Sequence, residues 1–319
     1  MENNNEKARV ALVLSSGGAR GYAHVGAIKA LEERGYRISS VAGASMGALV
    51  GGVYCTGKLD ELTEWFCKLT KREVLSLIDV SLAKSYVMKG EKLMNTIGTM
   101  VNDARIEKLD IPFRAIAADL VTQREVVFSK GSIERAIRSS ISMPSVLKPI
   151  EVAHHVLIDG GIVNPLPLNR VPRHAGDILV SVNVSAPASE DIVVKREAER
   201  QKRKESGLLS MKRMIQAIIP DRVTSNYMTL ISSAIALQIQ RHTVLAQKLT
   251  PPDIAVNIPM NRFGVFDFDH ASDIIRIGYE ETLKAIDRYE TLIKEPYNSV
   301  YEEKNRTCRN CRCFIRYRL

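Results

Sequence analysis

Short apolar runs alternate with helical patterns through the first part of the chain. Residues 10–14 form a continuous apolar run, which is typical of a strand buried on both faces of a parallel sheet. Residues 22–34 then carry apolar positions at helical spacing and stop before Gly35, a residue suited to a helix C-cap. A second predicted strand at 39–44 leads directly into a predicted helix at 46–56.

The same alternation continues to about residue 185. Further strands are predicted at 112–118, 125–128, 155–158 and 178–184, and further helices at 60–68, 91–101 and 131–141. Strands that alternate with helices favour an α/β fold, here a mostly parallel sheet flanked by helices.

The pattern changes after residue 185. Residues 186–206 are polar and charged, whereas 207–248 and 271–290 have the apolar spacing of helices. We therefore expect a C-terminal helical extension that packs against the sheet domain. The predicted parts are an α/β domain at 8–185, a charged linker or exposed helix at 186–206, the helical extension at 207–295 and a basic, Cys-containing tail at 296–319.

The composition is that of a globular protein. Of the 319 residues, 45% are hydrophobic and 25% are charged, which suffices for a sizeable core. The first residues carry acids and amides instead of the basic start of a signal peptide. No run approaches the ~18 apolar residues of a membrane span, so the sequence predicts a cytoplasmic location.

Positive charge is concentrated in two runs. The net charge is +9. Residues 304–319 hold six Lys or Arg and no acid, and residues 195–213 hold eight Lys or Arg against three Glu. Such runs favour anionic surfaces, which predicts peripheral contact with an anionic membrane; the alternative is a solvated helix face and a free end. No nucleic-acid recognition motif is present, and we expect no nucleic-acid partner.

The five cysteines give no disulfide framework. Cys308, Cys311 and Cys313 form a C-x-x-C-x-C cluster, but a zinc site needs about four ligands and no fourth one is near in sequence. We interpret them as free thiols and expect no metal.

The strongest chemical signal is Gly43-Ala-Ser45-Met-Gly47. A serine at a sharp turn between a strand and a helix has its hydroxyl exposed, and small residues two positions away on either side allow neighbouring backbone to pass closely. The helix that follows directs its positive end toward a developing oxyanion. Ser45 is therefore the candidate nucleophile, with Gly43 and Gly47 in support.

A glycine-rich loop at 16–21 follows the first strand. Its amides can converge on an anion. The spacing matches neither a dinucleotide loop nor a phosphate-binding P-loop. An oxyanion hole formed by the N–H groups of Gly17, Gly18 and Ala19 fits better.

Asp159-Gly160-Gly161 ends an apolar run and offers a candidate base. An aspartate is a weak base at neutral pH unless burial raises its pKa. Asp119 is the rival carboxylate. His24 and His155 are the histidines near the motifs, and a triad that contains a histidine stays an alternative.

Taken together, these three motifs resemble those of the patatin-like phospholipase family, in particular its small bacterial members. That family has a loop of form G-G-G-x-[RK]-G, a G-x-S-x-G serine and a D-G-[GA] aspartate; here they are Ser16-Gly-Gly-Ala-Arg-Gly21, Gly43–Gly47 and Asp159–Gly161. Residues 139–145 are similar to the family's Ser/Pro segment lining the site. The resemblance covers about residues 8–185, and Ser16 departs from it at the first glycine of the loop.

The resemblance implies a Ser45–Asp159 dyad without histidine, no cofactor and no metal. Arg20 would order the oxyanion loop, with Gly21, Gly160 and Gly161 in support. The implied activity is hydrolysis of carboxylic ester bonds of lipids, as in a phospholipase, lysophospholipase or esterase. Two alternatives remain: an acyltransferase that uses the same site, and a non-catalytic, membrane-associated regulatory protein.

Overall fold

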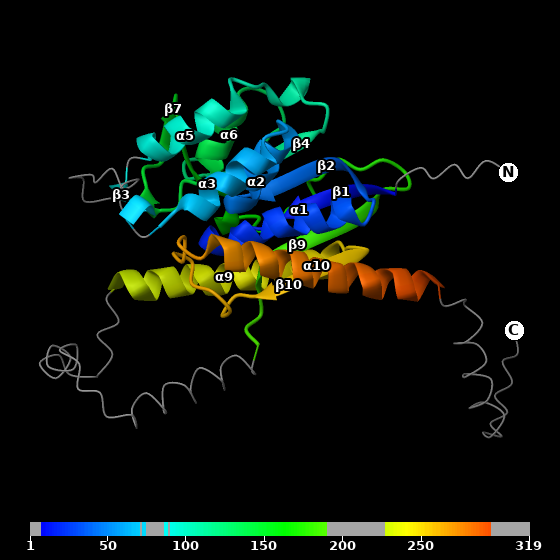
Figure 1. Ribbon diagram of the computed structural model, residues 1–319. Helices are drawn as coiled ribbons and strands as arrows, with labels where there is room; N and C mark the ends of the chain where they lie inside the picture. The colour runs from blue at the N-terminus through cyan, green and yellow to red at the C-terminus, as the bar shows by residue number, and fades with distance from the viewer. Residues whose placement is uncertain (1–7, 71, 75–85, 89, 190–226, 295–319) are drawn as a thin grey trace, which may run out of the picture.

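The computed structural model describes residues 8–70, 72–74, 86–88, 90–189 and 227–294 (Figure 1). Its centre is a mixed sheet in the order β10-β9-β1-β2-β4-β8-β7, with β5 paired to β4. The strands are β1 Arg9–Leu14, β2 Arg37–Ala44, β4 Phe113–Asp119, β5 Arg124–Phe128, β7 Ile150–Val152, β8 His155–Asp159, β9 Ile178–Ala186 and β10 Ile254–Pro259, with a separate pair of β3 Tyr86–Met88 and β6 Ser145–Leu147.

Helices flank this sheet. They are α1 Ala23–Glu33, α2 Met46–Cys55, α3 Leu59–Lys68, α5 Glu91–Val101, α6 Ile133–Ser140, α9 Tyr227–Leu249 and α10 Ala271–Lys294, with short 3₁₀ turns at Gly18–Tyr22, Ile106–Lys108 and Gly160–Ile162. The predicted α/β class, with a mostly parallel sheet flanked by helices, is confirmed. Each predicted strand and helix before residue 185 has its counterpart, with ends that differ by at most two residues.

The apolar run at the start of the chain is buried on both faces, as predicted. Val10, Leu12 and Leu14 belong to the larger core, beneath helices that include α1, α2 and α10. Ala11 and Val13 face the opposite way, into a smaller cluster with Leu166, Leu168 and Leu179 that Ala246 of α9 also contacts. A strand with no solvent-facing side has no polar positions, which explains its uninterrupted hydrophobicity.

The C-terminal part holds the helices α9 and α10, and it also contributes a strand that the sequence analysis did not identify. β10 pairs in parallel with β9 and extends the sheet by one strand. Ile254, Val256 and Ile258 are buried while the residues between them are less so, which is the period of a strand. This stretch is only six residues long and ends at Pro259. Its alternating pattern is too short to separate from the helical signal on either side. The division of the chain into four parts stays a prediction.

α10 lies along α1, and the two backbones approach closely (Figure 1). A Cβ on Gly26 of α1 would collide with the carbonyl of Ile275, and a Cβ on Gly278 of α10 would collide with the carbonyl of Ala23. The two glycines therefore permit the contact that fixes α10 on the sheet domain.

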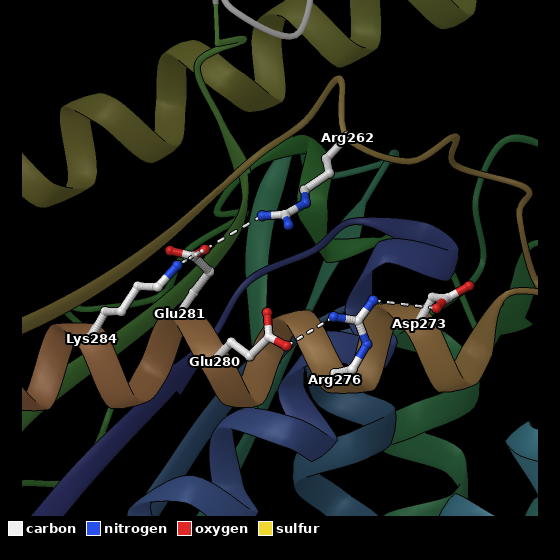
Figure 2. Close-up of polar contacts among 6 residues, drawn as sticks. All are labelled: Arg262, Asp273, Arg276, Glu280, Glu281 and Lys284. Atoms are coloured by element: carbon white, nitrogen blue, oxygen red, sulfur yellow. Dashed lines mark hydrogen bonds and ion pairs between the residues drawn. The ribbon is translucent and has the colours of Figure 1, made fainter.

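Ion pairs cover the outer side of α10 (Figure 2). Arg276 pairs with Glu280 at 2.8 Å and with Asp273 at 3.5 Å. Glu281 pairs with Lys284 at 3.0 Å and with Arg262 at 3.4 Å. Arg262 belongs to the segment 260–270 between β10 and α10, hereafter the β10–α10 loop, so this last pair joins the loop to the helix.

No helix among the described residues is long and apolar enough to cross a membrane. The two basic runs that carry the predicted membrane contact, 304–319 and 195–213, lie outside the described residues, and so do Cys308, Cys311 and Cys313.

Candidate active site

Ser45 occupies the turn between β2 and α2. Its φ of 53° and ψ of −124° are strained for a residue with a side chain. The motif glycines make this turn possible: a Cβ on Gly43 would collide with the backbone of Gly47, and a Cβ on Gly47 would collide with the carbonyl of Leu14. The G-x-S-x-G spacing is thus a steric requirement, and it leaves Ser45 at the N-terminus of α2.

The sheet topology brings Asp159 to this turn. β2 pairs with β4 up to Ala44 opposite Ile116, and β8 pairs with β4 from Asp159 opposite Ala117. β5 occupies the other edge of β4 from Ala115 to Asp119, which overlaps both stretches, so β2 and β8 share one edge and end at neighbouring residues. The predicted nucleophile and the predicted base therefore meet where the two strands end.

The two side chains form a direct hydrogen bond. The Oγ of Ser45 donates to Oδ2 of Asp159 at 2.6 Å, and the amide of Gly161 donates to Oδ1 at 2.7 Å. Asp159 is 1% exposed. Burial raises the pKa of this carboxyl to about 6, because desolvation outweighs the two hydrogen bonds that favour the charged form. Such a carboxylate is a stronger base than an ordinary aspartate but is still ionised at neutral pH.

A serine that our sequence analysis did not single out holds the backbone of Ser45. The Oγ of Ser140 accepts from the amide of Ser45 at 2.9 Å and donates to the carbonyl of Ile116 at 2.5 Å. The carbonyl of Ser142 accepts from the amide of Asp159 at 2.9 Å. Both serines fall in the stretch 139–145 that resembled the family's segment, which was the available signal.

Arg20 ties the glycine-rich loop together. Its Nε donates to the carbonyl of Gly17 at 3.1 Å, its Nη1 to the carbonyl of Met260 at 2.9 Å and its Nη2 to Oγ of Ser185 at 3.4 Å. Arg20 is 5% exposed, and burial lowers its pKa to about 10, which leaves it charged at neutral pH. The guanidinium thus spans the loop, β9 and the start of the β10–α10 loop.

The amides predicted to form the oxyanion hole are not equivalent. The amide of Ala19 donates to the carbonyl of Val265 at 2.9 Å and is therefore occupied. Gly18 has a φ of +58°, and a Cβ there would lie 2.6 Å from that same carbonyl oxygen. The amides of Gly17 and Gly18 donate to no group in the described part of the chain, which makes them the candidate donors. The covering residue, Val265, was not predicted.

The remaining motif glycines lie where neighbouring groups leave no room for a Cβ atom. A Cβ on Gly21 would collide with Met46, and a Cβ on Gly160 would collide with the carbonyl of Ile116. The absence of a side chain at these positions allows the glycine-rich loop and the turn after β8 to approach the turn between β2 and α2.

Asp119 and the histidines are engaged elsewhere. Asp119 accepts from Oγ1 of Thr122 at 2.6 Å, from the amides of Val121 and Val156, and pairs with Nδ1 of His155 at 2.7 Å. These hydrogen bonds hold the pKa of Asp119 well below its usual range. Nε2 of His24 bonds with the carbonyl of Ser15 at 2.8 Å, and burial lowers its pKa to about 4. Among the described residues, no histidine forms a hydrogen bond with the side chain of Ser45 or Asp159.

Comparison with known proteins points to one family. A family model described as patatin-like phospholipase matches residues 12–171, half of the chain. An NTE family protein of Mycobacterium bovis is 45% identical over 177 residues, which cover 56% of this chain and 49% of that protein. Neuropathy target esterase sws of Drosophila melanogaster is 32% identical over 190 residues, covering 57% of this chain and 13% of that protein.

A solved structure, that of VipD from Legionella pneumophila, aligns with a TM-score of 0.42 at 15% identity, covering 89% of this chain and 67% of that one. The matched region spans about half the length of the mycobacterial relatives and a much smaller share of the fly esterase.

Proposed function

The chain belongs to the patatin-like phospholipase family, and from this we propose that it is a serine acyl hydrolase that cleaves carboxylic ester bonds of lipids. The observation that carries the proposal is the 2.6 Å hydrogen bond from Ser45 to a buried carboxylate whose pKa is raised to about 6. The names of the relatives, which include an esterase, support the same reaction class.

In the proposed first half-reaction, the Oγ of Ser45 attacks the ester carbonyl carbon while its proton passes to Oδ2 of Asp159. The carbonyl oxygen becomes an oxyanion, which the amides of Gly17 and Gly18 stabilise together with the positive end of α2. The intermediate collapses, the C–O bond to the alcohol breaks, and Asp159 returns the proton to the leaving alcohol. The product is an ester of the acyl group with Ser45.

In the second half-reaction a water molecule replaces the alcohol. Asp159 accepts a proton from the water as the water oxygen attacks the acyl carbon. The bond between that carbon and Oγ of Ser45 breaks, and the proton on Asp159 restores the serine hydroxyl. The fatty acid leaves and the dyad is unchanged.

The test is hydrolysis of a short-chain p-nitrophenyl ester and of a phospholipid panel by the wild type, Ser45→Ala and Asp159→Asn. We expect both variants to fold, as judged by circular dichroism and thermal melting, and to lose activity by about 10²-fold or more. Activity that survives Ser45→Ala contradicts the proposal. Inactivity of all three proteins on every substrate favours a non-catalytic, membrane-associated role through the basic runs.

The acyltransferase alternative uses the same dyad and differs only in the acceptor. Product analysis separates the two: with a lipid alcohol added, a hydrolase yields mainly free fatty acid, whereas an acyltransferase yields mainly the new ester. The site geometry favours neither acceptor on its own, and the hydrolase assignment rests on the family.

A further inference from the structure

Ser16 stands at the first position of the glycine-rich loop, where the family pattern has glycine. Its backbone does not need a glycine, because it is not among the residues with positive φ. Its amide donates to the carbonyl of Pro165 at 2.8 Å, and its carbonyl accepts from Oγ of Ser185 at 3.0 Å and from Oγ of Ser15 at 3.1 Å. Hydrogen bonds therefore hold the backbone of Ser16 at both its amide and its carbonyl.

That side chain carries a buried hydroxyl without a partner. Ser16 is 1% exposed, and its Oγ makes no hydrogen bond to any group of the described residues. A buried polar group left unpaired is costly, and such groups in folded proteins usually have a reason. A glycine or alanine would fill the position without that cost, so packing alone does not account for the serine.

The hydroxyl lies beside the base. A Cβ placed on Gly161 would be 2.7 Å from Oγ of Ser16 and 3.0 Å from Oδ1 of Asp159. The hydroxyl and the carboxylate thus face the same glycine, whose own amide donates to the carboxylate. Ser16 also directly precedes Gly17, the first of the two amides with no other acceptor. The buried hydroxyl therefore lies beside the turn that holds Asp159, next to the glycine whose amide donates to the carboxylate.

We propose that Ser16 is a positioning residue for deacylation: its hydroxyl hydrogen-bonds the water that attacks the acyl group on Ser45. This inference rests on the proposed function. Once Oγ of Ser45 is esterified it no longer donates to Asp159, and the attacking water must take its place at the carboxylate. A single hydrogen bond to Asp159 leaves the orientation of that water open, and Ser16 offers a second one next to the same carboxylate.

The step balances without any further reactant. The water gives one proton to Asp159 and its oxygen bonds to the acyl carbon, while its contact with Ser16 is an ordinary hydrogen bond that transfers nothing. The carbon–Oγ bond of Ser45 then breaks, and the proton on Asp159 passes to that oxygen. Ser16 ends each cycle unchanged.

The experiment compares acylation and deacylation in the wild type, Ser16→Gly and Ser16→Ala. Ser16→Gly restores the family's residue and needs no new space, so it should fold. Acylation is measured as kcat/KM and as the burst of p-nitrophenol. Deacylation is measured as the loss of the acyl mass from isolated acyl-enzyme. We expect deacylation to slow by about tenfold or more, with acylation changed by less than about twofold. kcat and KM then fall together.

Ser15→Ala is the matched control, since the Oγ of Ser15 is already paired with the amide of Val184 and the carbonyl of Ser16. It should lower the melting temperature without changing the ratio of the two rates. An unchanged ratio in Ser16→Gly and Ser16→Ala would overturn the inference, and so would an equal loss in both steps, which points to oxyanion binding. Failure of the proposed function is distinct, because it is seen as absent or Ser45-independent hydrolysis in the wild-type background.

Discussion

The Oγ of Ser45 and the Oδ2 of Asp159 lie 2.6 Å apart, although 114 residues separate them in the chain. They meet because β2 and β8 end at adjacent residues on one edge of β4. The mixed character of the sheet is essential here: β8 runs antiparallel to β4, and it brings its last residue to the point where the parallel strand β2 stops. Strand pairing thus places Asp159, the last residue of β8, beside Ser45, which directly follows the last residue of β2.

Activity should depend on the ionisation of Asp159. Its pKa is raised to about 6 by burial, and the base is the ionised form, so activity is lost as the pH falls through that value. kcat/KM should be level from about pH 7 upward and fall about tenfold per pH unit below 6. Fatty-acid release measured by chromatography avoids the pH dependence of a chromophore. The fluorescence of the single tryptophan shows that the fold persists at each pH. An inflection near pH 4, or none, would contradict the assignment.

Asp119→Asn and Asp159→Asn should have different consequences. Asp119 bonds to Thr122 and His155 and not to Ser45, so its variant should retain activity within about threefold, whereas Asp159→Asn loses it. The pKa of Asp119 is depressed in the folded state. Its contribution to stability is therefore present above the ordinary carboxyl pKa and lost as the pH falls below it. The melting temperature of the wild type should therefore exceed that of Asp119→Asn at pH 7, and the difference between the two should be smaller at pH 3. Loss of activity in Asp119→Asn with an intact fold would make Asp119 the better candidate base.

Arg20→Lys should impair catalysis, although it keeps the charge. The single ammonium group of lysine cannot reproduce the planar guanidinium, whose nitrogens donate at the same time to the carbonyls of Gly17 and Met260. We expect kcat/KM to fall about tenfold and the melting temperature to drop by several degrees. Arg262→Lys is the control, because the 3.4 Å pair of Arg262 with Glu281 is partly exposed and such pairs contribute little. Equal changes of kcat/KM and of the melting temperature in the two variants would show that Arg20 does not order the glycine-rich loop.

The contact between α1 and α10 should tolerate no added methyl group. Gly26→Ala and Gly278→Ala each place a Cβ against a backbone carbonyl of the other helix, and overpacking of this kind costs about 1–3 kcal/mol. Gly98→Ala in α5 is the matched control: its Cβ would first meet Glu134 at 3.4 Å, and alanine favours a helix by about 1 kcal/mol over glycine. The free energy of unfolding, measured with urea, should be equal to or above that of the wild type for Gly98→Ala. It should be lower than that of the wild type for Gly26→Ala and Gly278→Ala. Wild-type stability of Gly26→Ala would contradict the close approach.

Local patterns in the sequence predicted most of the fold. Strand β1 and helices α1 and α2 follow from runs and spacings within a few residues, and the two-sided burial of β1 was readable from its lack of polar positions. β10 was missed because a strand of six residues that ends in a proline carries too little periodicity. The motifs indicated Ser45 and Asp159, but their pairing came from the family resemblance, since strand order is not a local property.

The unpredicted contacts all depend on distant parts of the chain. Ser140 reaches the amide of Ser45 from α6, and Val265 reaches the amide of Ala19 from the β10–α10 loop. The only sequence signal for Ser140 was its place in the stretch 139–145, and Val265 has no distinctive neighbour in sequence. Ser16 is different: as a departure from the family pattern it was visible at once, but the buried, unpaired state of its hydroxyl required the structure.

The most direct test of the Ser45–Asp159 dyad is covalent labelling by a fluorophosphonate, which a nucleophilic serine attacks with loss of fluoride. Intact mass and peptide mapping give the site, and the time course gives the rate in wild type, Ser45→Ala and Asp159→Asn. We predict one phosphonyl group on Ser45 in the wild type, none in Ser45→Ala, and labelling slowed about 10²-fold or more in Asp159→Asn. Labelling at another residue, or at an unchanged rate in Asp159→Asn, would contradict the account.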